Sequence, residues 1–196
     1  KDKPYDRLPQ LSVKYRVPWV TQFDLTGISD FAYFKRPIND GSAPEQSGGR
    51  LYNKLTAAYP MTRTWGYVTP SVSLQHLYTQ FDQESADANG LDKNSKSQSI
   101  FVPQFSIDSG LNFFKTGTPF GKFDDSLGGY QLLSPRLKYV YSPYKDQTDV
   151  PNFNTRLASL NFSQLYEDSW FLGYDRLPDN NHLTPSLNYR YIDGNG

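Results

Sequence analysis

The sequence predicts an all-β fold, an antiparallel meander of about eight strands that forms part of a large transmembrane β-barrel. Three observations lead to this prediction. The 196 residues include 3 Trp, 15 Tyr and 13 Phe, although only 37% of the chain is hydrophobic and its mean hydropathy is −0.67. Glycine and proline, 14 residues each, interrupt the chain throughout. Several segments also alternate between apolar and polar residues, which gives a sheet one apolar and one hydrated face.

Charge, hydropathy and cysteine count exclude other classes of protein. The 20 basic and 20 acidic residues give a net charge of zero, which argues against a nucleic-acid partner bound by phosphate neutralisation. No apolar stretch approaches the ~18–20 residues of a membrane helix, so a helical membrane protein is excluded. The chain contains no cysteine, so it holds neither a disulfide nor a thiolate metal site. We expect no cofactor.

Five segments share one local plan, in which a proline precedes an alternation of apolar and polar residues. They cover 8–15, 69–75, 102–108, 134–139 and 184–191. Because side chains of a strand point alternately to its two faces, Phe105 and Ile107 share one face, while Ser106 and Asp108 share the other. Proline cannot donate to the sheet ladder, so its recurrence near strand starts indicates the rim of a sheet.

Extension from these anchors predicts the strands in order, with boundaries uncertain by ~2–4 residues. They are expected near 8–17, 19–34, 50–60, 65–81, 98–114, 129–142, 169–175 and 182–192. The expected short connections are 17–19, 61–64 and 177–181, and the long polar ones are 35–49, 82–97 and 143–168. The connection at 115–128 breaks this alternation, because it is long although its place in the order is that of a short connection. A short helix is expected within 155–166. Short turns at one end and long loops at the other are typical of an outer-membrane barrel.

A soluble β-sandwich shows the same alternation, because it packs one face of each sheet into a core. The placement of aromatic residues favours the barrel, since those near predicted strand ends would form the girdles at the two membrane interfaces. These residues are Trp19, Trp65, Tyr67, Tyr141, Tyr144, Trp170 and Phe171.

The sequence offers little for catalysis or for metal binding. Only His76 and His182 could serve as bases near neutral pH. Ser73 has the opposite parity to His76, and no evident Ser or Asp constellation surrounds His182. An outer-membrane phospholipase would need a serine–histidine pair on neighbouring strands. The acidic loop at 82–92 lacks the ligand spacing of an EF-hand. We therefore expect neither a catalytic residue nor a metal site.

Polar side chains opposite the aromatic face are better candidates for function. They are Asp108, Asn112, Arg136, Lys138, Asn188 and Arg190. In a hydrated lumen these groups could contact sugars or phosphates through charge-assisted hydrogen bonds. The alternative, of about equal weight, is that these side chains do no more than solvate the lumen wall.

Residues 133–149 resemble a recurrent segment of the lipopolysaccharide-assembly outer-membrane family LptD, also called organic solvent tolerance protein. Further similar segments are 5–11, 103–110, 152–154, 162–168 and 173–177. The resemblance implies a barrel of about 26 strands in the bacterial outer membrane, preceded by a periplasmic domain. It also implies the plug lipoprotein LptE, lipopolysaccharide or lipooligosaccharide, periplasmic bridge proteins and membrane lipid as partners, with no enzymatic step.

The resemblance implies that residues 1–196 are a fragment of the barrel domain, without the N-terminal periplasmic domain, the gate strands or the family's disulfide cysteines. The longest connection is also the most family-like, so it is expected to contact LptE. The residues proposed for this contact are Tyr144, Asp146, Asp149, Tyr166 and Asp168. The alternatives to a lipopolysaccharide translocon are a porin-like channel and a soluble carbohydrate-binding β-sandwich.

Overall fold

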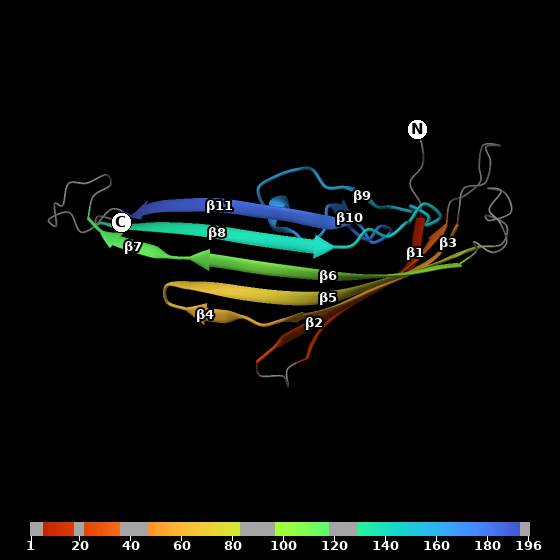
Figure 1. The fold of residues 1–196 in the computed structure, drawn as a ribbon. Coiled ribbons are helices and arrows are strands. Elements are labelled where there is room, and N and C mark those ends of the chain that lie inside the picture. The colour runs from red at the N-terminus through yellow and green to blue at the C-terminus, as the bar shows by residue number, and fades with distance from the viewer. Residues whose placement is uncertain (1–5, 18–21, 36–46, 83–96, 118–128, 193–196) are drawn as a thin grey trace.

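The chain forms one curved antiparallel sheet, seen in a computed structural model that describes residues 6–17, 22–35, 47–82, 97–117 and 129–192 (Figure 1). Its strands are β1 (Asp6–Val17), β2 (Asp24–Lys35), β3 (Gly48–Ala58), β4 (Met61–Arg63), β5 (Gly66–Phe81), β6 (Ser97–Leu111), β7 (Phe113–Thr116), β8 (Tyr130–Ser142) and β11 (Asn180–Ile192). Two further strands, β9 (Arg156–Leu157) and β10 (Phe171–Leu172), form a separate ladder, and a 3-10 turn, η3, covers Gln164–Tyr166.

Neighbours in the main sheet follow each other along the chain, in the order β1-β2-β3-β5-β6-β8-β11. β4 adds to the beginning of β5, and β7 adds to the beginning of β8. Every pairing is antiparallel, so the predicted all-β meander is confirmed. Within the described ranges, no helix has the length and hydropathy needed to cross a membrane.

Six of the eight predicted strands lie where the alternation places them, within a few residues, but the second begins later than expected, at Asp24. Residues 61–64 are not a simple turn. Met61–Arg63 pairs with the start of β5, so the tight turn is reduced to Thr64 and Trp65. The connections predicted at 17–19, 35–49, 82–97 and 115–128 lie largely outside the described residues.

The predicted strand at 169–175 is wrong. Only Phe171–Leu172 is extended there, and it pairs with β9 rather than with the main sheet. The predicted turn at 177–181 is also wrong, because Asn180 already belongs to β11 and lies opposite Ser142 of β8. The helix predicted within 155–166 is reduced to the single 3-10 turn η3. Residues 143–179 therefore form one long connection between β8 and β11, which we call the inner segment.

One face of the sheet is apolar and bare. Phe105, Leu137 and Leu187 lie on it and are 48%, 43% and 67% exposed, so no described part of the chain covers them. The same face carries Leu11, Val13, Tyr15, Leu55, Val68, Val72, Leu74, Phe101, Ile107, Leu111, Tyr139, Tyr141, Leu183 and Tyr189, all exposed. A soluble sandwich would bury such a face beneath a second sheet. An exposed apolar surface of this extent fits contact with lipid.

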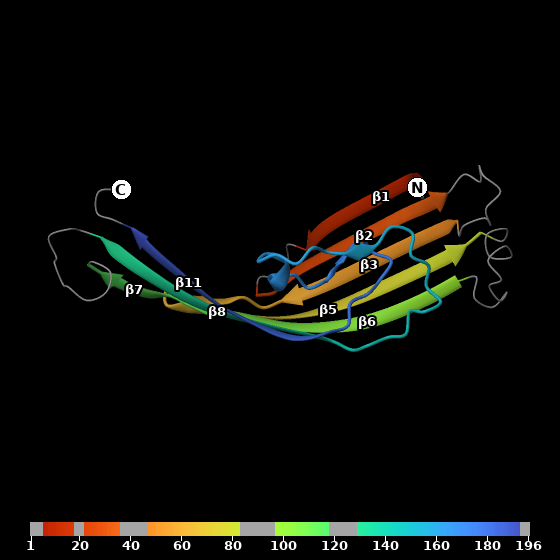
Figure 2. The same cartoon turned by 90° about the horizontal axis from the view of Figure 1, so that it is seen from above.

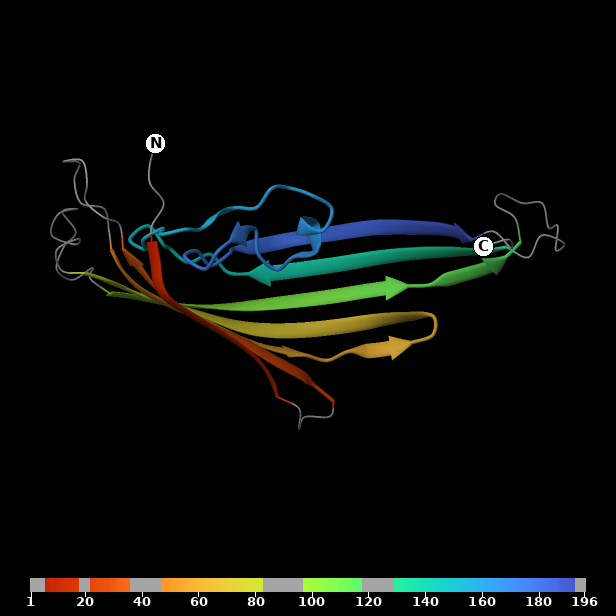
Figure 3. The same cartoon turned by 180° about the vertical axis from the view of Figure 1, so that it is seen from behind.

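The opposite face is polar and partly covered by the inner segment, which lies on the side towards which the sheet curls (Figures 2 and 3). Its buried residues include Asp30, Arg50, Gln75, Gln104 and Lys138. Two small apolar clusters join the sheet to the segment. One contains Ala32, Phe34, Phe81 and Phe153, and the other contains Tyr52, Leu77, Val102, Val150 and Leu177.

The aromatic residues predicted to form girdles divide into two groups. Trp65 and Tyr141 are exposed at strand ends, and Tyr144 is exposed just after β8. Trp19 lies outside the described residues.

The other three aromatic residues lie on the polar side of the sheet. Tyr67 is close to the start of β5, as predicted, but its hydroxyl donates to Asp108 on the polar face. Trp170 and Phe171 belong to the inner segment, where the Trp170 ring packs edge-on against His182 at 5.2 Å between centroids. These two residues were placed at a strand end only because 169–175 was mistaken for a barrel strand.

Candidate functional site: the inner segment and its anchors

A buried arginine fixes the inner segment to the sheet. Arg50 of β3 is 1% exposed, and its guanidinium donates to Asp30 Oδ1 at 3.0 Å and to Asp175 Oδ1 at 2.5 Å. Asp30 comes from the neighbouring strand β2, whereas Asp175 comes from the inner segment. The second oxygen of Asp175 accepts the backbone N–H groups of Asn154 and Thr155 at 2.7 and 2.9 Å. One carboxylate thus joins the sheet and both limbs of the segment, and we call this cluster the Arg50 anchor.

Aromatic rings surround the Arg50 anchor and shield it from water. Phe34 of β2 stacks on Phe153 at 4.5 Å between centroids, and Tyr52 of β3 stacks on Tyr174 at 4.4 Å. The Arg50 guanidinium lies 4.9 Å from the Phe34 ring centroid and 5.6 Å from that of Tyr174. Low polarity around the charges strengthens their attraction but makes an unpaired charge costly.

Gly173 has a backbone φ of +112°, and a Cβ there would lie 2.5 Å from Thr155 Oγ1. A residue without a side chain is therefore required where the two limbs of the inner segment meet.

A second anchor surrounds Asp168. The Lys138 ammonium donates to Asp168 Oδ1 at 2.7 Å, and that of Lys54 lies 3.4 Å from Oδ2. The backbone carbonyl of Asp168 accepts from Gln104 Nε2 at 2.8 Å and from Asn180 Nδ2 at 2.9 Å. These partners come from β8, β3, β6 and β11, so the Asp168 anchor joins four strands to one point of the segment.

Electrostatics keep the Asp168 carboxylate ionised. Burial alone would raise the pKa of Asp168, but the nearby ammonium groups of Lys54 and Lys138 outweigh burial and hold this pKa below its ordinary value of 3.8. A carboxylate whose pKa is lowered on docking stabilises the docked state above the ordinary pKa. This stabilisation is lost as the pH falls through the lowered pKa.

We therefore expect the contribution of Asp168 to docking, taken as the difference between the wild type and Asp168→Asn, to be constant between about pH 5 and 8 and to weaken only below about pH 4. Hydrogen exchange of residues 164–170 in the full-length protein, corrected for the intrinsic pH dependence of exchange, measures this. If the extra protection of the wild type over Asp168→Asn fell between pH 5 and 7, the assignment of Asp168 as an ionised anchor would be contradicted.

Some of the predicted lumen-lining residues bind the inner segment or a neighbouring strand, and others are exposed. Lys138 is buried beneath the inner segment and also donates to the Tyr166 carbonyl at 2.6 Å. Arg136 binds Asp108 through two hydrogen bonds of 2.9 and 2.5 Å, and its guanidinium lies 4.0 Å from the Tyr166 ring centroid.

Three other predicted lumen residues lie beyond this cluster. Asn112 is half-buried between β6 and β7 and accepts a hydrogen bond from Ser134. Asn188 and Arg190 of β11 are exposed on the polar side of the sheet. A role of these side chains in contacting saccharide stays a prediction.

The residues predicted to contact a partner protein face in different directions. Tyr144, Asp146 and Asp149 are exposed, and Asp146 accepts hydrogen bonds from the backbone and hydroxyl of Thr148. In contrast, Tyr166 and Asp168 face the sheet and help to hold the inner segment on it. Their contact with a partner is untested.

The anchor residues Asp30, Arg50, Lys54 and Asp175 were not among the predicted site residues. Asp30, Arg50 and Lys54 could have been found by the parity rule that selected Arg136, because they lie on the polar face of their strands. Asp175 was included in a family-like segment but was assigned to a strand, so its role as a buried anion could not be anticipated.

The structure also pairs one histidine with a serine. His76 Nε2 lies 3.0 Å from Ser99 Oγ across β5 and β6, a partner on a neighbouring strand that the sequence did not single out. The His76 ring stacks on Phe101 at 4.1 Å. Among the described residues, no third group is hydrogen-bonded to His76 to orient it as in a catalytic triad. In the same ranges, no cluster of three or more His, Cys, Asp or Glu side chains could hold a metal ion.

Comparison with known proteins connects this architecture to a family. A family model described as LptD, LPS transport system D, matches residues 1–196. The chain belongs to the LptD family. It is 64% identical over 196 residues to the LPS-assembly protein LptD of Psychrobacter cryohalolentis, covering all of this chain and 20% of that protein.

Two further relatives carry the same name. The LPS-assembly protein LptD of Psychrobacter arcticus is 63% identical over 196 residues, covering all of this chain and 22% of that protein. That of Acinetobacter baylyi is 40% identical over 199 residues, covering all of this chain and 23% of that protein. The chain thus spans about a fifth of the length of these relatives. Membership in the LptD family confirms the predicted resemblance, and the curved meander is a section of an LptD barrel.

Proposed function

We propose that this LptD chain forms a wall of an outer-membrane translocon that delivers lipopolysaccharide to the outer leaflet, and that its inner segment narrows the lumen. The observation that carries this proposal is the contrast between the two faces of the sheet. One face is bare and apolar, and the other is polar and covered by a segment that buried charges hold in place. Lipid on one side and a hydrated, partly filled lumen on the other account for both faces.

The same contrast separates the proposal from its alternatives. A carbohydrate-binding sandwich would cover the apolar face, and a general porin needs an open lumen. The inner segment contacts strands from β2 to β11, which favours an obstructed lumen. Further proposed partners are the plug lipoprotein LptE, which Tyr144, Asp146 and Asp149 could reach because they are exposed, and periplasmic bridge proteins that bind outside residues 1–196.

We further propose that the protein works without making or breaking covalent bonds. Ser99 and His76 approach each other on the bare face, but both lie within strands whose backbone N–H groups serve the sheet. An oxyanion would therefore find few free donors there.

Replacement of residues 143–179 in the full-length protein by four Gly and Ser residues tests the role of the inner segment. Ser142 and Asn180 lie directly opposite each other, so a hairpin-sized loop can join β8 to β11. In planar bilayers, the unchanged protein should conduct little, and the shortened protein should show discrete ion currents. Equal currents from both proteins would contradict an obstructing role.

Depletion of the full-length protein in cells tests the function itself. Surface lipopolysaccharide, measured by labelling of whole cells, should fall severalfold and should return with the wild-type gene. Normal lipopolysaccharide delivery after depletion would overturn the proposal.

A further inference from the structure

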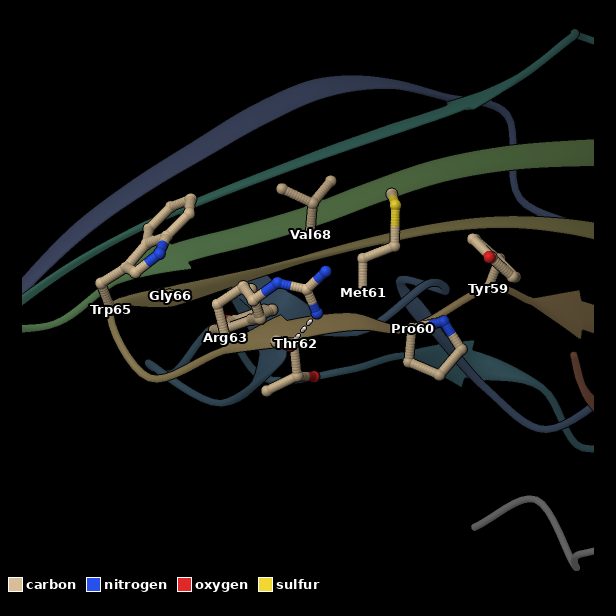
Figure 4. Close-up of a pocket in the computed structure, with 9 residues that line it drawn as sticks. Tyr59, Pro60, Met61, Thr62, Arg63, Trp65, Gly66 and Val68 are labelled. Carbon is tan, nitrogen blue, oxygen red and sulfur yellow. Dashed lines mark hydrogen bonds between the residues drawn. The ribbon is translucent and has the colours of Figure 1, made fainter. Parts of the chain in front are cut away.

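A notch lies at the hairpin formed by β4 and β5. Its volume is about 740 Å³, and its lining includes Met61, Arg63, Trp65 and Val68. In the hairpin register, Met61 lies opposite Val68, and Arg63 lies opposite Gly66. Figure 4 shows Met61, Arg63, Trp65 and Val68 on one side of the hairpin and Thr62 on the other. Because Val68 belongs to the bare apolar face, the Arg63 side chain does so too.

Among the described residues, the Arg63 charge has no acidic partner. The guanidinium donates one hydrogen bond, to the exposed carbonyl of Thr62 at 3.0 Å, and no carboxylate within the described ranges pairs with it. Its neighbours are apolar. Trp65 is 63% exposed, and Met61 and Val68 are also exposed. An arginine on a lipid-facing surface needs an anion, because its remaining N–H donors are otherwise left without acceptors.

A glycine opposite Arg63 lets neighbouring strands approach closely. Gly66 lies opposite Arg63 in β4 and opposite Leu111 in β6, and a Cβ on Gly66 would lie 2.5 Å from the carbonyl oxygen of Gly110. Glycine therefore permits close approach of β5 and β6 beside Arg63, and the Leu111 side chain packs over the glycine.

The notch also lies where the tight turn at Thr64 and Trp65 ends the β4–β5 hairpin. Tryptophan is enriched at membrane interfaces, and arginine extends its charged end towards lipid headgroups there.

We propose that this notch binds a membrane glycerophospholipid, with its phosphodiester on Arg63 and an acyl chain along Met61 and Val68. Charge complementarity selects an anionic group, and the apolar lining selects a ligand that carries a chain. The planar guanidinium can donate two parallel hydrogen bonds to a phosphate. This inference rests on the membrane-barrel arrangement in the proposed function, although it does not require lipopolysaccharide transport.

Native mass spectrometry of the full-length protein, titrated with phosphatidylglycerol in detergent, tests the site. Arg63→Gln should weaken the tightest phosphatidylglycerol-binding step by about three- to tenfold, and Arg63→Lys should restore part of it. Arg156→Gln is the matched control, because Arg156 is exposed on the inner segment, away from the bare face. Diacylglycerol, which lacks the phosphate, should bind both Gln variants and the wild type equally weakly, and inorganic phosphate should not compete.

Equal phosphatidylglycerol binding by the wild type and Arg63→Gln would overturn the proposal. An equal loss in Arg156→Gln would also overturn it, since net charge would then be responsible. Displacement by inorganic phosphate would show a simple anion site instead of a lipid site. Surface lipopolysaccharide should be unchanged in Arg63→Gln. If the transport function were wrong, depletion would leave lipopolysaccharide unaffected while the lipid titration still distinguished the variants.

Discussion

Replacement of Arg50 by methionine is expected to release the inner segment from the sheet. Arg50 and its two carboxylate partners, Asp30 and Asp175, are each at most 1% exposed. Loss of the guanidinium would leave two buried negative charges without a cation, and removal of one member of a buried ion pair costs about 3–5 kcal/mol. The opening equilibrium of the segment should therefore rise by about two to four orders of magnitude.

Hydrogen exchange of residues 151–176 in the full-length protein measures this effect. Arg190→Met is a suitable control, because it makes the same substitution at an exposed position of β11. Addition of Asp30→Asn and Asp175→Asn to Arg50→Met should recover part of the protection, since the triple variant buries no unpaired charge. Wild-type protection in Arg50→Met, or a triple variant less protected than the single one, would show that the aromatic stacks alone hold the segment.

Asp168→Ala is expected to have the second-largest effect. The substitution would leave Lys138, whose side chain is 10% exposed, and Lys54, at 20%, without their shared carboxylate. Asp168 itself is 32% exposed, so water and salt screen its interactions more than those of Asp175. We expect the free energy of docking to fall by about 1–3 kcal/mol, which is roughly a five- to 150-fold rise in opening.

Asp168→Asn should have a smaller effect, because an amide oxygen can still accept from Lys138. The matched control is Asp149→Ala, an exposed aspartate of the same segment. Hydrogen exchange of residues 164–170 provides the measurement. An effect as large in Asp149→Ala as in Asp168→Ala would mean that net charge, rather than the Asp168 anchor, governs docking.

Residues of the bare and polar faces could be assigned from sequence because strand alternation is a local property. Phe105 and Leu137 follow directly from the two-residue period, and so does the inward direction of Arg136 and Lys138. The same rule applied to Arg50 and Lys54 would have found both cations. It failed for residues 169–175, whose apolar character resembles that of a strand although the segment packs on the sheet instead of joining it.

The sequence by itself determined the two-faced antiparallel meander of this LptD chain, because the alternation of apolar and polar side chains is set by neighbouring residues. Only the tertiary structure decided that residues 143–179 lie across the polar face and that Asp175 meets Arg50, 125 residues earlier in the chain. A charged side chain pairs with whichever opposite charge the fold brings within reach. That choice depends on the curvature of the whole sheet and on burial by distant residues, which local patterns do not encode.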